Sequence, residues 1–123
     1  MKRTIVTSLL IPFVVFAAKA LAGEADIVDA VVYKDRNNTW RFDVTVAHAD
    51  VGWEHYADRW EVLAPDGTVL ATRVIYHPHV TEQPFTRSLV NVHIPDDVKV
   101  VRVRARDSIH GYGGKEIKLE LRR

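Results

Sequence analysis

The chain has 123 residues, no cysteine and nearly balanced charge, with 17 basic and 16 acidic side chains. This balance argues against a protein that binds nucleic acid or an anionic membrane surface. Without cysteines, a domain of this size must be stabilised by its hydrophobic core alone.

The first 22 residues have the pattern of an export signal. Met1-Lys2-Arg3 is basic, residues 5–18 are almost entirely apolar, and Ala20-Leu21-Ala22 has the small side chains that a signal peptidase recognises. We predict cleavage near Ala22, which leaves residues 23–123 as one domain. The apolar run is shorter than the roughly 20 residues that span a bilayer. We therefore expect a periplasmic or secreted bacterial protein without a membrane span.

Alternation of apolar and polar residues predicts seven strands after this signal. The expected strands cover residues 27–34, 40–46, 60–64, 68–76, 85–94, 101–106 and 117–121. Three of the connections contain residue pairs that favour tight turns, namely Asn37-Asn38, Asp66-Gly67 and Asp96-Asp97. In the fifth strand we expect Val90, Val92 and Ile94 to face the core. Seven short strands at this spacing predict an all-β, antiparallel sandwich.

Trp60, in the third predicted strand, carries a resemblance to a known fold. The chain resembles immunoglobulin-like and fibronectin type III domains, and antibody domains have a core tryptophan in the corresponding strand. It lacks the cysteine pair of antibody domains. The resemblance implies a sandwich fold and no particular activity.

Five of the six histidines are predicted to gather at one end of this sandwich. Because consecutive strands run antiparallel, alternate connections lie at the same end. The connections after the second, fourth and sixth strands contain His48, His55, His77, His79 and His110. His93 is expected near the opposite end.

This histidine end is a candidate site for a divalent metal, Zn(II) or Cu(II). Imidazole is a common ligand for both metals, and two histidines separated by one residue project the same way from extended backbone. The expected ligands are His77, His79, His110, His55, His48 and Glu82, with Glu54 as an alternative carboxylate. The arrangement resembles small periplasmic copper-carrying β-sandwiches of the CopC type, which also place histidines at loop ends. This chain lacks their histidine near the mature N-terminus and the methionine-rich loop that some of them carry.

The same loops also allow two interpretations that need no metal. Histidines are common in polar loops, where they bond backbone carbonyls. Alternatively, the loops contact a protein partner through Trp53 and Tyr112, which lie next to glycines. Tyr76 and Phe85, at strand ends, are instead expected to complete the core.

A hydrolase is disfavoured. Asp107, Ser108 and His110 have the residue types of a catalytic triad, but they are neighbours in one short loop, whereas a triad normally draws its members from separate segments. We expect Asp107 and Ser108 to bond the loop backbone instead. The sequence therefore predicts a binding domain and no enzyme.

Overall fold

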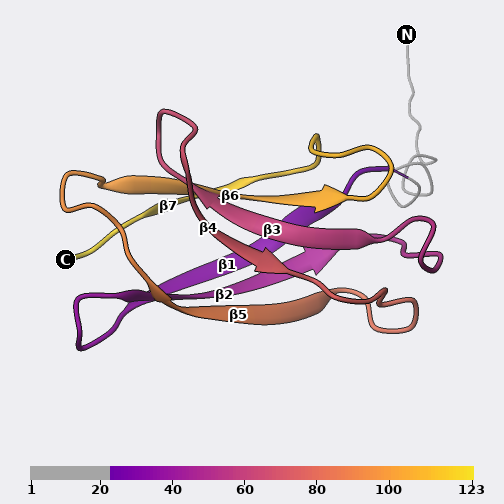
Figure 1. Ribbon diagram of the computed structural model, residues 1–123, viewed down its shortest axis with the longest axis horizontal. Helices are drawn as coiled ribbons and strands as arrows, with labels where there is room; N and C mark the ends of the chain where they lie inside the picture. The colour runs from indigo at the N-terminus through magenta and orange to yellow at the C-terminus, as the bar shows by residue number, and fades with distance from the viewer. Residues whose placement is uncertain (1–22) are drawn as a thin grey trace, which may run out of the picture.

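The computed structural model describes residues 23–123, and the predicted export signal lies outside them. Two antiparallel sheets pack face to face, with strand orders β1-β2-β5 and β4-β3-β6-β7 (Figure 1). The strands are β1 (Asp26–Lys34), β2 (Trp40–Ala47), β3 (Ala57–Leu63), β4 (Val69–Val74), β5 (Phe85–Val92), β6 (Val100–Asp107) and β7 (Ile117–Glu120). The predicted all-β sandwich is therefore confirmed. The described residues contain no helix that is long and apolar enough to cross a membrane.

The alternation within the strands accounts for the core. In β2, Trp40, Phe42, Val44 and Val46 are buried, while the residues between them face outward or lie partly exposed. Trp60 of β3 is fully buried. Full burial of an apolar side chain is worth about 1.5–3 kcal/mol, so these residues supply stability that disulfides provide in cysteine-rich domains.

Two residues expected in the core lie outside it. Val90 is 51% exposed, whereas Val92 is buried. Trp40 pairs with Val92 and Phe42 pairs with Leu89, so β5 has one residue more than β2 between these two pairs. Asn91, within this stretch, has a positive φ of 58°. This bulge turns Val90 outward, so its predicted burial is wrong. Tyr76 is 74% exposed because β4 ends at Val74 and the chain then leaves the sheet.

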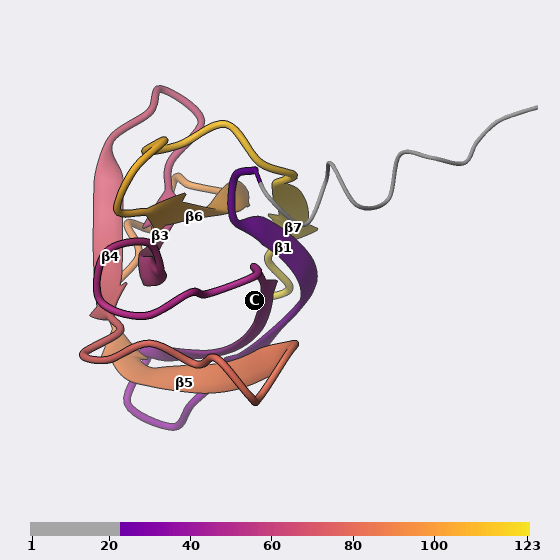
Figure 2. The same cartoon turned by 90° about the vertical axis from the view of Figure 1, so that its right-hand side faces the viewer.

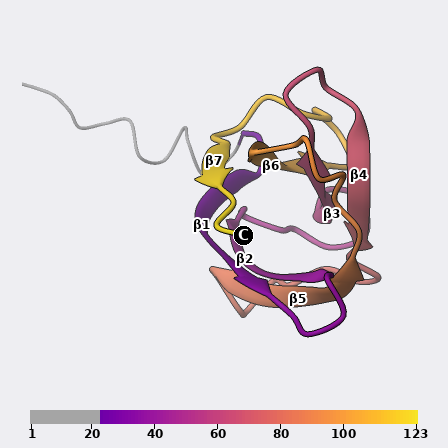
Figure 3. The same ribbon diagram turned by 90° about the vertical axis from the view of Figure 1, so that its left-hand side faces the viewer.

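The long loops and the tight turns lie at opposite ends of the sandwich. The β2–β3, β4–β5 and β6–β7 loops share the right-hand end in Figure 1, which faces the viewer in Figure 2. Figure 3 shows the other end, where the C-terminus lies. Some connections pass from one sheet to the other, yet the strands still alternate in direction. The three histidine-bearing loops therefore gather at one end, as predicted.

Candidate metal centre

Two histidines and one aspartate converge at the loop end. His48 follows β2, His55 lies in the β2–β3 loop, and Asp107 is the last residue of β6. The Nε2 atoms of His48 and His55 are 3.2 Å apart. His55 Nε2 lies 3.3 Å from Asp107 Oδ1, and His48 Nε2 lies 3.8 Å from Asp107 Oδ2. One donor atom from each residue lies within 4.8 Å of the other two, so this group can hold a metal ion.

The spacing of these atoms fits shared coordination. Two ligands bonded to zinc at about 2.0–2.1 Å with a tetrahedral angle lie roughly 3.3 Å apart. The distance of 3.2 Å between the two Nε2 atoms and that of 3.3 Å from His55 Nε2 to Asp107 Oδ1 match this value. The distance of 3.8 Å from His48 Nε2 is longer and ends on the other carboxylate oxygen, Oδ2. Two imidazoles and a carboxylate suit Zn(II), and imidazole also suits Cu(II).

His48 and Asp107 point into the molecule because they continue the strand alternation. His48 comes two residues after the buried Val46, and Asp107 comes two residues after the buried Ala105. Successive inward positions of a strand are two residues apart. Both side chains are fully buried. Asp107 was not among the predicted metal ligands, and this continuation of the inward face is the signal that could have identified it.

Asp50 holds His48 from the side away from the donor group. Asp50 Oδ1 lies 2.6 Å from His48 Nδ1 and accepts the Ala57 amide at 3.0 Å, while Oδ2 accepts the His79 amide at 2.7 Å. Burial raises the pKa of this carboxyl, but the three hydrogen bonds outweigh burial and lower the pKa below its ordinary value.

This contact fixes which nitrogen of His48 faces the donor group as an acceptor. An ionised carboxylate only accepts hydrogen bonds, so His48 Nδ1 donates to Asp50, and Nε2 is the nitrogen that can offer a lone pair to the donor group. A carboxylate bonded to the far nitrogen orients ligand histidines in many metal sites. Sequence reasoning also missed Asp50, which continues the inward face two residues beyond His48.

Asp107 is held in its ionised form by the loop that follows it. Its Oδ1 accepts the amides of Ile109 and His110 at 2.8 and 2.6 Å. Its Oδ2 lies 3.2 Å from His110 Nδ1. Burial again raises the pKa of Asp107, but these hydrogen bonds outweigh it and the pKa is lowered.

The two carboxylates give the site a negative character. Asp50 and Asp107 have fully buried side chains, and within residues 23–123 their ion-pair partners are histidines. Buried charge is costly unless it is paired. A bound cation would neutralise this charge.

His110 stands beside the donor group. Its ring centroid is 5.0 Å from that of His55, and its Nδ1 faces Asp107. The side chains of His110 and His55 are 36% and 18% exposed, whereas those of His48 and Asp107 are fully buried. The side of the group that faces solvent is therefore the side of His55 and His110.

The other predicted ligands lie in the β4–β5 loop and make different contacts. The rings of His77 and His79 are 4.9 Å apart. His79 stacks on Phe85 at 4.2 Å, and its Nε2 lies 2.6 Å from Arg87 Nη2. Burial and the charge of Arg87 lower the pKa of His79, so its neutral ring accepts from the guanidinium. Glu82 is 56% exposed and lies 3.3 Å from the same guanidinium. The structure does not bring these three predicted ligands into the donor group.

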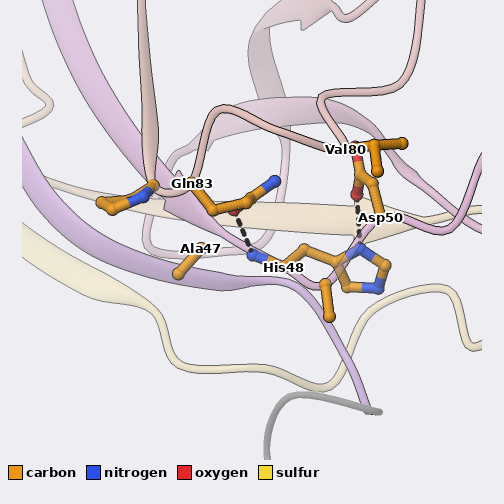
Figure 4. Close-up of a pocket in the computed structure, with 7 residues that line it drawn as sticks. Ala47, His48, Asp50, Val80 and Gln83 are labelled. Carbon is orange, nitrogen blue, oxygen red and sulfur yellow. Dashed lines mark hydrogen bonds and ion pairs between the residues drawn. The ribbon is translucent and has the colours of Figure 1, made fainter.

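A cavity of about 380 Å³ opens beside His48 (Figure 4). It is lined by Ala47, His48, Ala49, Asp50, Val80, Gln83 and Pro84. Gln83 Oε1 accepts the His48 amide at 2.9 Å, and Gln83 Nε2 donates to the His79 carbonyl at 2.9 Å. Figure 4 shows His48 between Gln83 and Asp50. Hydrogen bonds of Gln83 thus connect the β4–β5 loop to the segment that contains His48.

The two predicted recognition residues have different surroundings. Trp53 is 67% exposed, with its ring 5.7 Å from that of Tyr56. The Tyr112 hydroxyl donates to Glu61 at 3.0 Å and accepts from Arg59 at 3.2 Å, and the Arg104 guanidinium lies 3.7 Å from its ring centroid. Trp53 is therefore presented to solvent, while Tyr112 takes part in contacts within the chain.

Asp107 and Ser108 both bond backbone amides, but of different loops. Ser108 Oγ accepts the Tyr56 amide at 3.1 Å, and Asp107 accepts two amides of its own loop. Asp107 thus bonds the backbone of its own loop, as predicted, whereas Ser108 bonds the backbone of the β2–β3 loop.

Comparison with known proteins gives one informative relative. No family model matches the chain, and no solved structure matches it. A protein of Halomicrobium mukohataei named "Putative lipoprotein" is 39% identical over 92 residues. The aligned region covers 75% of this chain and 45% of the relative, so the chain corresponds to less than half of the relative's length.

Proposed function

We propose that the protein is a non-enzymatic exported binding domain whose loop end binds one divalent metal ion, Zn(II) or Cu(II). The observation that carries the proposal is the convergence of His48 Nε2, His55 Nε2 and the Asp107 carboxylate at the spacing of shared coordination. The chain has no Cys, and its single Met is Met1. Nitrogen and oxygen donors without thiolate or thioether favour a divalent ion over Cu(I).

Two further observations support the rest of the proposal. The name of the Halomicrobium relative supports export of this chain. The strand orders β1-β2-β5 and β4-β3-β6-β7, with Trp60 buried between the sheets, support an immunoglobulin-like or fibronectin type III-like sandwich.

Calorimetric titration of the purified protein with Zn(II) tests the metal site. His55→Ala is the informative variant because His55 is partly exposed and its removal leaves the buried pair of His48 and Asp50 in place. His77→Ala is the matched control, since His77 is exposed and lies outside the donor group. We expect one Zn(II) in the wild type and in the control. His55→Ala should lose more than the roughly 10–100-fold in affinity that loss of a second-shell partner costs. Equal affinity in all three proteins would contradict the proposal.

A second candidate function is recognition of a protein partner by the same loops without metal. Trp53 is 67% exposed, Val51 of the same loop is 61% exposed, and Val80 of the β4–β5 loop is 56% exposed. Exposed tryptophan is a frequent energetic centre of protein interfaces. Trp53→Ala should keep the melting temperature of the wild type and abolish capture of a periplasmic partner. Unchanged capture would exclude a role for Trp53.

A further inference from the structure

We propose that the metal held by His48, His55 and Asp107 keeps an exchangeable coordination position that takes a small exogenous ligand. The inference rests on the proposed metal site and specifies what the loaded site binds. It follows from the number of protein donors, from their burial and from the position of His110.

The donor group supplies three ligands. Within residues 23–123 the residues whose donor atoms all lie within 4.8 Å of one another are His48, His55 and Asp107. Structural zinc sites have four protein ligands, whereas zinc sites with three protein ligands keep the fourth position for water or an external ligand. Two histidines with one carboxylate are also a known set that leaves positions open on other divalent metals.

The open position faces solvent. The side chains of His48 and Asp107 are fully buried. Asp50 bonds His48 Nδ1, and two backbone amides bond the Asp107 carboxylate. His55 is 18% exposed, and the neighbouring His110 is 36% exposed. The side of His55 and His110 is therefore the side from which water and small solutes approach the metal.

His110 is the residue of this chain that could close the position. Its Nδ1 donates to the ionised Asp107 at 3.2 Å, and its backbone amide bonds the same carboxylate. These contacts hold the ring against Asp107 and outside the donor group. We therefore assign His110 to the rim of the site and leave the fourth position to an exogenous donor. The two carboxylates lie on the buried side, so an exogenous ligand approaches the metal from the exposed side.

Azide is a suitable probe, because it is a small anion that coordinates Cu(II). The purified protein is loaded with one equivalent of Cu(II) and titrated with sodium azide, and visible absorption and electron paramagnetic resonance are recorded. In the wild type we expect a new azide-to-copper charge-transfer band and a shift of the copper resonance, both saturating at one azide per copper. His110→Ala should keep the azide band, with Cu(II) affinity lowered by no more than the roughly 10–100-fold that loss of an outer-shell partner costs. His55→Ala should not hold copper at this site and should not give the response.

The outcomes separate this inference from the proposed function. If the wild type does not bind Cu(II) or Zn(II), the metal site itself is wrong and the inference fails with it. If Cu(II) binds but azide leaves both spectra unchanged, the metal site stands and the exchangeable position is overturned. Azide sensitivity that appears in His110→Ala and is absent in the wild type would show that His110 fills the fourth position. An undiminished response in His55→Ala would place the responding copper elsewhere and overturn the inference.

Discussion

Replacement of Asp50 by Asn probes the contact that orients His48. Asp50 accepts hydrogen bonds from His48 Nδ1, the Ala57 amide and the His79 amide at 2.6, 3.0 and 2.7 Å. Asn has one accepting oxygen, and its amide group would face a donor at the other position. Hydrogen bonds to charged groups contribute about 1.5–3 kcal/mol each, and a buried donor left without a partner costs about 1–3 kcal/mol. We therefore expect Asp50→Asn to lower the free energy of unfolding by about 2–4 kcal/mol.

Urea unfolding at neutral pH measures this loss. Asp96→Asn is the matched control, because Asp96 is 88% exposed in a turn at the opposite end and such surface changes stay within about 0.5 kcal/mol. Asp50→Asn should also weaken Zn(II) binding by roughly 10–100-fold, since outer-shell carboxylates have effects of that size. Wild-type stability together with wild-type Zn(II) affinity would refute the reasoning that Asp50 fixes the orientation of His48.

Three further predictions concern stability. Because the pKa of His79 is lowered in the folded protein, the unfolded chain binds its proton first, so the free energy of unfolding should fall as the pH drops below about 6.5. The corresponding series of urea titrations should be flatter for His79→Gln, and an equally steep profile would assign the effect to other groups. In Gly114→Ala the added Cβ would lie 1.9 Å from the Ala25 carbonyl oxygen, so we expect the free energy of unfolding to fall by about 2 kcal/mol, measured by thermal unfolding. An unchanged melting temperature would show that the backbone at Gly114 and Ala25 adapts to the added methyl group. Tyr112→Phe removes a hydrogen bond to Glu61 and should cost about 1–2 kcal/mol in urea unfolding, and a variant as stable as the wild type would show that the bond contributes nothing.

The fold and the end of the molecule that carries the site could be predicted from side-chain alternation. Period-two patterns such as that of β2 define strands with one buried face, and antiparallel neighbours place alternate loops together. Alternation wrongly predicted that Val90 is buried, because a bulge adds one residue to β5. The local sequence gives no sign of this bulge. Bulges depend on the partner strand, which one stretch of sequence does not identify.

Which histidines converge could not be predicted from the loops alone. The two histidines around Pro78 drew attention by their spacing, but His79 packs on Phe85 and bonds Arg87, two contacts that depend on the tertiary fold. His55 reaches His48 through a turn in which its amide bonds the Gly52 carbonyl. Loop geometry of this kind is set by individual hydrogen bonds, whereas strand geometry is set by repetition.

Asp107 and Asp50 lie at sequence positions that indicate burial. Both follow the inward positions of a strand at intervals of two residues, where an apolar side chain is the usual occupant. A carboxylate at such a position is buried at the strand end and must find partners there. Continuation of the inward face beyond a strand is therefore a better guide to this site than the spacing of histidines within one loop.

The central claim is that His48, His55 and Asp107 share one metal ion, and anomalous diffraction tests it most directly. Crystals of the protein loaded with Zn(II) are measured on both sides of the zinc absorption edge. We predict one anomalous peak within about 2.0–2.2 Å of His48 Nε2, His55 Nε2 and a carboxylate oxygen of Asp107. A peak bounded by His77 and His79, or a zinc-loaded crystal without a peak at His48, would contradict the account.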